Sequence, residues 1–317
     1  MRLKQVITGL ILLLTLAACS IETAKTPPQR KLIIASDYLQ AKDTLLFHRF
    51  AKENAVHISI ETMSADSLIE RIRTKQANSG IDVVVLESLY DVTRLDKRGL
   101  FHPIDLRAKT PEAIHYSSLS YNYIGFGIDP YIIAHEQNNS YTIKTYNDLT
   151  HFNYVSALAQ KHAPILLAPI LKNLTEEQKG QWIKQYTKHA ISKPIPRDSL
   201  LNDSLFNRLP ILTTQSNFKL NKVSNSTYKS KTLLFPKKTA KDCYYNLRSL
   251  AVISQASNYT TAISFIDFCT TKKVNLALNE VLNTSSIYSN QYGIKQEDSP
   301  IEKQIPLYSN IELLLEK

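Results

Sequence analysis

Residues 64–100 read SADSLIERIRTKQANSGIDVVVLESLYDVTRLDKRGL, and the order of patterns in this stretch indicates the fold. Residues 66–74 place their apolar side chains at the spacing of one helix face. Residues 82–86 (DVVVL) carry a continuous apolar run, as in a strand that is buried on both faces. Residues 89–98 form a second helical pattern, which ends at Gly99, a favourable position for a helix C-cap. A helix, a buried strand and a helix in succession predict an α/β domain.

The same alternation extends toward the N-terminus. Residues 31–36 (KLIIAS) and 56–61 have the patterns of strands, and residues 43–54 have a helical pattern between them. The order βαβαβα predicts a mostly parallel sheet with helices on both faces. The next expected strand, Tyr121–Asp129, leaves this first unit.

A second α/β unit follows, and no internal repeat is visible. The returning strand at Leu233–Pro236 is expected to be the second connection between the units. The remaining expected elements are helices at 145–149, 175–189, 199–209 and 259–270, an apolar run at 165–170 and a strand at 250–254.

The N-terminus has the pattern of an export signal. Two basic residues precede the apolar run Val6–Leu16, and Leu16-Ala17-Ala18-Cys19 closes it. The run is shorter than the roughly 20 residues of a membrane-spanning helix. Leu-Ala-Ala-Cys resembles the bacterial lipobox, so residues 1–18 are expected to be a signal peptide and Cys19 a lipidated residue. The alternative is an ordinary signal peptide that ends near a cysteine. Residues 19–30 are expected to form a flexible tether.

Composition narrows the function further. The formal net charge is +10 with scattered lysines, which is typical of a solvated basic surface, and the export signal disfavours nucleic-acid binding. Only seven glycines occur, which argues against Gly-rich phosphate loops. Outside the cytoplasm Cys243 and Cys269 are compatible with a disulfide and equally with two buried thiols.

Catalytic motifs are missing from the sequence. HExxH, GxSxG and CxxC do not occur, so neither an enzyme nor a resident cofactor is expected. The chain has 17 tyrosines. Some of them lie in two clusters, one with Tyr116, Tyr121 and Tyr123 and the other with Tyr244-Tyr245. Two interpretations stay open for these clusters: ordinary packing with the hydroxyl in water, or the lining of a ligand cleft.

Several short motifs in order resemble the ferric-iron type of bacterial ABC-transporter solute-binding proteins, over nearly all of residues 31–293. The matched positions in the opening stretch are Leu68, Arg71, Ala77-Asn78-Ser79, Asp82, Gly99-Leu100 and Pro103. Later matches are Lys144-Thr145-Tyr146-Asn147-Asp148-Leu149, Trp182-Ile183, Arg197-Asp198, Phe235-Pro236, Asn246 and the segment Ala262 to Phe268.

The sequence also departs from that family. The family's adjacent tyrosines ligate Fe(III), but here Asn217-Phe218 stands in their place, and neither residue supplies a phenolate. The family's Asn-x-Ser-Gly element reads Asn246-Leu247-Arg248-Ser249. The first-lobe loop Ser36-Asp37-Tyr38-Leu39 lacks the histidine that the family often has. Because Fe(III) prefers anionic oxygen ligands, the resemblance implies the fold but not the usual iron site.

The patterns and the resemblance together imply a two-lobe periplasmic-binding-protein fold, type II-like, in which helices flank a mostly parallel sheet in each lobe. Lobe 1 is expected at 31–120 with 240–285, and lobe 2 at 121–239. Residues 286–317 are expected to pack back on the lobes.

The function implied is that of a lipid-anchored protein that captures a small ligand for an ABC importer. The ligand is either a metal such as ferric iron or a small anion, and the partner is a permease of the inner membrane. A monomer is expected, facing the periplasm or the extracellular side. The alternative is a degenerate relative that acts as an interaction or structural lipoprotein of the envelope.

Candidate ligand-binding residues follow from the fold, because ligands of open α/β sheets lie beyond the carboxyl ends of the strands. Two loops occupy such positions: Ser36, Asp37 and Tyr38 after the first strand, and Glu87 and Ser88 after the DVVVL strand. Lobe 2 and the connections add Tyr116, Tyr121, Asn217, Tyr244 and Arg248. This set offers either a metal site through Asp37, Glu87 and a tyrosine, or an anion site through Arg248 and hydroxyls.

Overall fold

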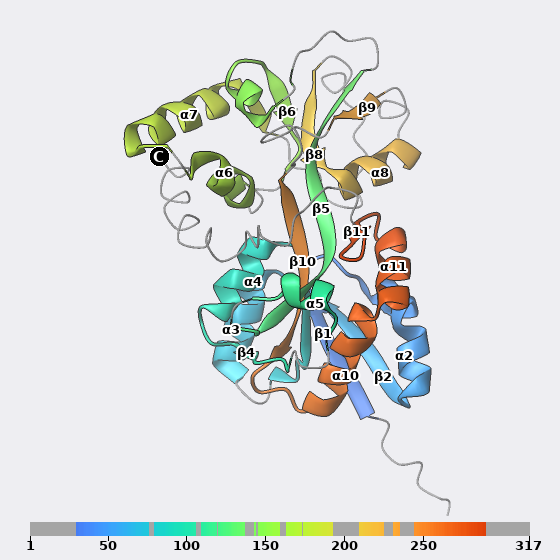
Figure 1. Ribbon diagram of the computed structural model, residues 1–317. Coiled ribbons are helices and arrows are strands. Elements are labelled where there is room, and N and C mark those ends of the chain that lie inside the picture. Colours follow the sequence, from blue (N-terminus) through green and yellow to red (C-terminus); the bar gives the residue numbers. More distant parts are fainter. Residues whose placement is uncertain are drawn as a thin grey trace, which may run out of the picture.

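A computed structural model of the chain shows two groups of helices and strands joined by two long strands (Figure 1). It describes residues 30–75, 79–105, 109–118, 120–136, 143, 145–158, 163–172, 174–192, 209–224, 231–234 and 244–289. One path of hydrogen-bonded strands runs through both groups in the order β2-β1-β3-β10-β5-β8-β6-β7, with β4, β9 and β11 attached at its sides.

Lobe 1, the lower group in Figure 1, is built around four strands: β1 (Arg30–Ser36), β2 (Val56–Thr62), β3 (Val83–Leu86) and β4 (Phe101–His102). Strand β1 pairs in parallel with β2 and β3. Its helices are η1 (Ala41–Phe47), α2 (His48–Glu53), α3 (Ala65–Lys75), α4 (Leu89–Asp96), α5 (Pro111–His115), α10 (Tyr259–Thr270) and α11 (Lys272–Val281). Helices α3 and α4 lie on one side of the sheet, and α2, α10 and α11 lie on the other, as the alternating pattern predicted (Figure 1).

Lobe 2, the upper group, contains β6 (Tyr154–Ser156), β7 (Ala190–Ser192), β8 (Ile211–Thr214) and β9 (Lys231–Leu234). Strand β6 pairs in parallel with β7 and β8. Its helices are η3 (Tyr146–Thr150), α6 (Ala163–Leu171), α7 (Glu176–His189) and α8 (Gln215–Ser224). The apolar run 165–170 therefore lies within helix α6.

Strands β5 (Tyr123–Glu136) and β10 (Tyr245–Ile253) connect the lobes and pair with each other antiparallel. Strand β10 continues into lobe 1 beside β3, and β5 continues into lobe 2 beside β8 and β9. Pro130 stands where β5 exchanges β10 for β8, a place that tolerates the missing backbone donor of proline. Parallel pairing thus holds within the lobes, and the connecting strands make the sheet mixed.

One expected connection was wrong. Leu233 lies in β9, which pairs with β5 inside lobe 2, and the second connecting strand is β10. The expected helix at 199–209 falls almost entirely outside the described residues, as do Cys19, Cys243 and residues 290–317. The other expected strands and helices are present, but β5 continues beyond Asp129 to Glu136 and β10 begins at Tyr245 instead of Leu250. The helical segments at 41–47 and 146–150 are 3-10 helices. No helix in the described part of the chain is both long and apolar enough to cross a membrane.

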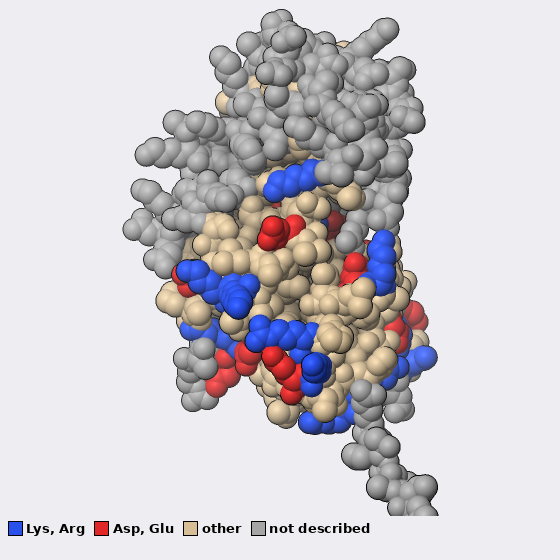
Figure 2. All heavy atoms as spheres, turned by 90° about the vertical axis from the view of Figure 1, so that its right-hand side faces the viewer, with Lys and Arg blue, Asp and Glu red and all other residues tan. Residues whose placement is uncertain are grey.

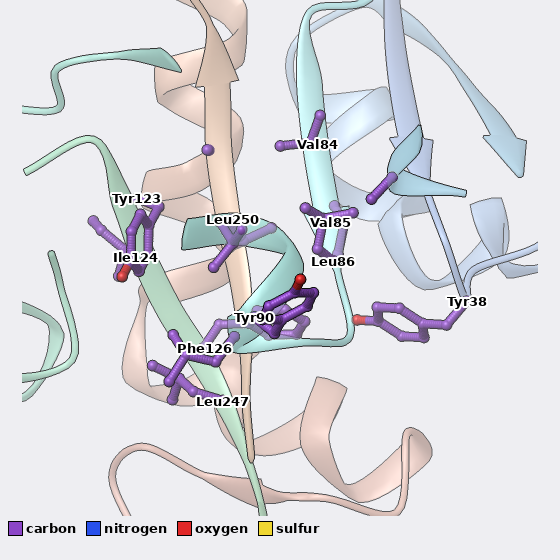
Figure 3. Close-up of a cluster of buried hydrophobic side chains, with 14 of the residues drawn as sticks. Tyr38, Val84, Val85, Leu86, Tyr90, Tyr123, Ile124, Phe126, Leu247 and Leu250 are labelled. Carbon is purple, nitrogen blue, oxygen red and sulfur yellow. The ribbon is translucent and has the colours of Figure 1, made fainter. Parts of the chain in front are cut away.

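The core of lobe 1 lies between the sheet and its helices. Figure 3 shows Tyr38, Leu86, Tyr90, Phe126 and Leu247 gathered around the ends of β3, β5 and β10. All five side chains are at most 7% exposed, so this apolar cluster extends up to the junction of the lobes. Burial of this kind stabilises the fold by roughly 25 cal/mol per Å² of apolar surface.

Gly127 of β5 is needed because a buried polar network lies against it. A Cβ at this position would overlap with Oδ1 of Asn279, which also accepts a hydrogen bond of 2.6 Å from Thr284. The amide of Asn279 donates to the Phe126 carbonyl at 2.8 Å, which holds α11 on β5. We expect Gly127→Ala to lower the free energy of unfolding by about 1–3 kcal/mol, as overpacking does, in urea titrations. Gly180→Ala is the control, because its Cβ would meet open space and alanine favours the helix by up to about 1 kcal/mol.

Candidate functional site

The side chain of Arg248 lies at the junction of the two lobes. Strand β10 has a bulge between Arg248 and Ser249, and the guanidinium is only 5% exposed. Its Nη2 lies 3.6 Å from Oε1 of Glu87 and 3.5 Å from Oδ2 of Asp129, and donates to Oγ of Ser216 at 3.1 Å. Glu87 follows β3 of lobe 1 and Ser216 opens α8 of lobe 2, so one side chain connects both lobes.

The loop after β1 covers this guanidinium. The ring of Tyr38 lies over Arg248, with 4.7 Å between the guanidinium carbon and the ring centroid. Asp37 accepts a hydrogen bond of 2.8 Å from the backbone nitrogen of Glu87, which joins the two predicted loops. Ser36 has a structural role instead: its hydroxyl donates to the Val85 carbonyl at 2.6 Å and is buried.

Asn246 positions the loop after β3. Its Oδ1 accepts from the backbone nitrogen of Leu89 at 3.0 Å, and its Nδ2 donates to the Glu87 carbonyl at 2.5 Å. Ser88 is the N-cap residue of α4, but its side chain makes no cap bond and is fully buried. Asn246 therefore caps this helix from β10 and fixes the backbone of Glu87.

Asp129 of β5 anchors the start of α8. Its carboxylate accepts from the backbone nitrogen of Ser216 at 2.9 Å and from the Ser216 hydroxyl at 2.5 Å. Complete burial raises the pKa of Asp129 above its ordinary value, and the charge of Arg248 and the hydrogen bonds from Ser216 offset this only in part. Burial alone would lower the pKa of Arg248, but the charges of Asp129, Tyr38, Glu87 and Asp37 outweigh it and raise that pKa.

The lobes also touch on a second side. Helix α6 of lobe 2 lies against α4 and against β10 (Figure 1). Glu87 and Ser88 directly precede the N-terminus of α4. The polar cluster around Arg248 is therefore enclosed between two points of contact, the start of α8 and the α4–α6 pair.

Four further predicted site residues lie in other local surroundings. Tyr121 is 49% exposed in a turn of lobe 1 with a φ of 58°, and Tyr116 is buried after α5. Burial raises the pKa of the Tyr116 phenol to about 12. The ring of Tyr244 packs against that of Tyr146, with 4.8 Å between the centroids. The backbone nitrogen of Asn217, in the first turn of α8, donates a hydrogen bond to Oγ1 of Thr214.

The structure brings together Asp37, Tyr38, Glu87 and Arg248 from the predicted set. Sequence reasoning missed Asp129, Ser216 and the positioning role of Asn246. A signal for Asp129 existed, because a carboxylate inside the apolar stretch YNYIGFGIDPYII has to find a partner when the strand is buried. Ser216 has no comparable signal in the sequence.

Three features of the described residues bear on which ligand the cluster around Arg248 could hold. Among the described residues, no three His, Cys, Asp or Glu side chains form a group suited to a metal ion. Phe218, which is expected to replace the family's second tyrosine, is 1% exposed in the core of lobe 2 and is used for packing. On the face in Figure 2, acidic and basic side chains of the described surface are interspersed rather than gathered by sign.

Comparisons with known proteins agree with this architecture. No protein-family model matches the chain. Iron uptake protein A1 of Synechocystis sp. (strain ATCC 27184 / PCC 6803 / Kazusa) is 21% identical over 263 residues, and the match covers 77% of this chain and 72% of that protein.

Solved structures are similar over almost the whole chain. A Trichodesmium protein (IdiA, FutA) in complex with iron and citrate has a TM-score of 0.73 at 16% identity, over 90% of this chain and 98% of that one. The ferric binding protein from Campylobacter jejuni has a TM-score of 0.73 at 18% identity, over 90% and 97% of the two chains. The two-lobe periplasmic-binding-protein fold is thus confirmed, as is the resemblance of this chain to the ferric-iron type of ABC-transporter solute-binding proteins.

Proposed function

We propose that this chain is a solute-binding protein that captures a small ligand between its lobes and delivers it to an ABC importer. The observation that carries this proposal is the cluster around Arg248, in which Glu87 of lobe 1 and Ser216 of lobe 2 meet one side chain. A ligand at such a junction contacts both lobes, and therefore stabilises their closed arrangement by differential affinity. The permease would recognise that closed form.

The proposal includes a hinge. We place lobe 1 at 31–120 with 240–285 and lobe 2 at 121–239, with β5 and β10 as the strands that bend. Ligand binding should then make the protein more compact, which small-angle scattering with and without ligand would measure. An identical profile at saturating ligand would argue against capture by closure.

The ligand class that we favour is ferric iron, because the relatives are named for iron uptake and ferric binding. Ser216, Asp129 and Glu87 place oxygen atoms within 3.6 Å of Arg248 at the junction. The ring of Tyr38 lies over the same guanidinium. The site lacks adjacent tyrosines at Asn217-Phe218, so we expect weak Fe(III) binding, or binding only with a bridging anion, and no strong tyrosinate colour. Metal analysis of protein purified without added metal, followed by a titration with ferric citrate, tests this.

One observation favours the alternative of a non-transport envelope protein: the place of the second family tyrosine belongs to a buried phenylalanine, Phe218. The titration distinguishes ligand capture from the non-transport function. One equivalent of bound iron or small anion, with compaction, supports capture. Protein that binds neither under any of these conditions supports the alternative.

We also propose that Cys19 is lipidated and holds the protein at a membrane, facing the periplasm or the extracellular side. Strand β1 begins at the end of lobe 1 farthest from lobe 2 (Figure 1). The segment between Cys19 and Arg30 spans at most roughly 40 Å even when fully extended. The tether would therefore attach at the end of lobe 1 that lies opposite the junction of the lobes, and would leave that junction accessible to a permease.

Cys19→Ala should abolish labelling with a radioactive fatty acid and move the protein from the membrane pellet to the soluble fraction, or leave it as precursor. Ser20→Ala is the matched control and should leave labelling unchanged. Mature Cys19→Ala protein that still sediments with membranes would contradict the anchor.

A further inference from the structure

We propose that the guanidinium of Arg248 occupies the cation position between the interlobe carboxylates, so that Arg248 determines whether a bare metal cation is accepted there. This inference rests on the proposed function, because it concerns the site where the ligand would be captured. It assigns a role to a side chain at which the sequence departs from the resembling family, whose element has serine in this place.

The geometry is that of an occupied cation site. Nη2 of Arg248 lies within 3.1–3.6 Å of oxygens from Ser216, Asp129 and Glu87. Carboxylate and hydroxyl oxygens are donors of the kind that hard cations prefer, and these come from both lobes. The face of the guanidinium is covered by the ring of Tyr38, so its position is held by stacking as well as by charge.

The charge of this occupant is permanent. An arginine does not lose its proton in proteins, unlike a buried lysine, so the site cannot become free of positive charge by deprotonation. A second cation a few ångströms away would meet repulsion from this charge, and burial screens that repulsion less than water does. A trivalent ion meets three times the repulsion of a monovalent one at the same distance.

The side chain also has little room to leave. It is 5% exposed, and Nη1 donates to the Leu282 carbonyl at 3.3 Å. Helix α6 lies against β10, which carries Arg248. Displacing the guanidinium toward solvent would therefore require the lobes to part, and a metal ion alone would have to supply the energy for that movement.

Terbium(III) binding tests the inference, because terbium prefers oxygen ligands and its luminescence is sensitised by a nearby tyrosine such as Tyr38. Arg248→Gln removes the charge and keeps hydrogen-bonding groups, and Arg248→Lys keeps the charge. We expect Arg248→Gln to bind terbium at least tenfold more tightly than the unaltered protein, and Arg248→Lys to stay within about threefold of it. Arg98→Gln, on an exposed residue, controls for the loss of one positive charge elsewhere.

A double variant covers the case in which Arg248→Gln fails to fold because Asp129 and Glu87 lose their partner. Arg248→Gln with Asp129→Asn leaves the net charge of the cluster unchanged and still vacates the central position. If this variant binds terbium more tightly than the unaltered protein, the result supports the inference, because the central position has lost its positive charge while the net charge of the cluster has not changed. Equal affinity of the unaltered protein and of every folded Arg248→Gln variant would overturn it.

The outcome does not depend on the physiological ligand. If the unaltered protein carries no ligand but the variants gain terbium, the role of Arg248 stands and the capture function fails. If the unaltered protein binds its ligand with compaction and the variants gain no affinity for terbium, only the inference about Arg248 fails.

Discussion

Replacement of Asp129 with alanine is expected to lower the free energy of unfolding by about 3 kcal/mol. Removal of one partner from a buried ion pair typically costs 3–5 kcal/mol, because the remaining charge stays buried without compensation. The lower end applies here, since Glu87 lies 3.6 Å from Arg248 and still offsets part of its charge. The substitution also removes the acceptor of two hydrogen bonds from Ser216 at the start of α8. Urea unfolding followed by circular dichroism would measure the loss.

Asp129→Asn is the matched control for this prediction. Its amide oxygen can still accept from the backbone nitrogen of Ser216, whereas the charge is lost, so an intermediate loss of stability is expected. If the alanine and asparagine variants are both as stable as the unaltered protein, Asp129 does not anchor the junction, and the contacts of Arg248 with lobe 2 carry little energy.

Phe265→Ala is expected to have an effect of similar size, about 3–5 kcal/mol, in the core of lobe 1. The ring is fully buried in α10 and makes edge contacts with Phe47 at 4.9 Å and with Phe50 at 5.3 Å between centroids. Its removal leaves a cavity between α10 and the η1–α2 segment, in addition to the loss of apolar burial. Thermal unfolding should therefore begin at a lower temperature.

Phe265→Leu separates cavity formation from a general effect of substitution at this site. Leucine fills much of the space, so its cost should be clearly smaller than that of alanine. Losses of equal size in both variants would show that the ring geometry, rather than the filled volume, stabilises this contact.

Phe265 and Asp129 differ in how well the sequence alone predicts their roles. Helix α10 was predicted because its apolar residues repeat with the period of a helix, and that repetition reflects burial along one local face. Asp129 was missed because its burial depends on residues far away in the chain, Ser216 and Arg248. Single-sequence patterns report local periodicity and contain no information on which distant side chain will compensate a buried charge.

The connecting strand β10 was misplaced for a related reason. Its first half, YNLRS, lacks an apolar pattern, so the sequence predicted a strand only from Leu250 onward. That half is polar because Asn246 and Arg248 serve the junction instead of an apolar core. The apolar pair Leu233-Leu234 predicts a strand more clearly, but this strand pairs with β5 inside lobe 2 and does not connect the lobes. The predicted loops after β1 and β3 were found at the junction, since the rule for the carboxyl ends of strands depends on topology alone.

The pairing of β3 with β10 has a consequence for the order of folding. Val85 pairs with Leu250, so the sheet of lobe 1 lacks one of its central strands until the chain has been synthesised to residue 253. Contacts so distant in sequence slow folding, because a long loop has to close before they form. During this time the edge of the wholly apolar strand VVVL has no partner on one side, the kind of edge at which chains aggregate. Until β10 pairs with it, β3 is therefore the strand of lobe 1 at which an incompletely folded chain is most exposed to aggregation.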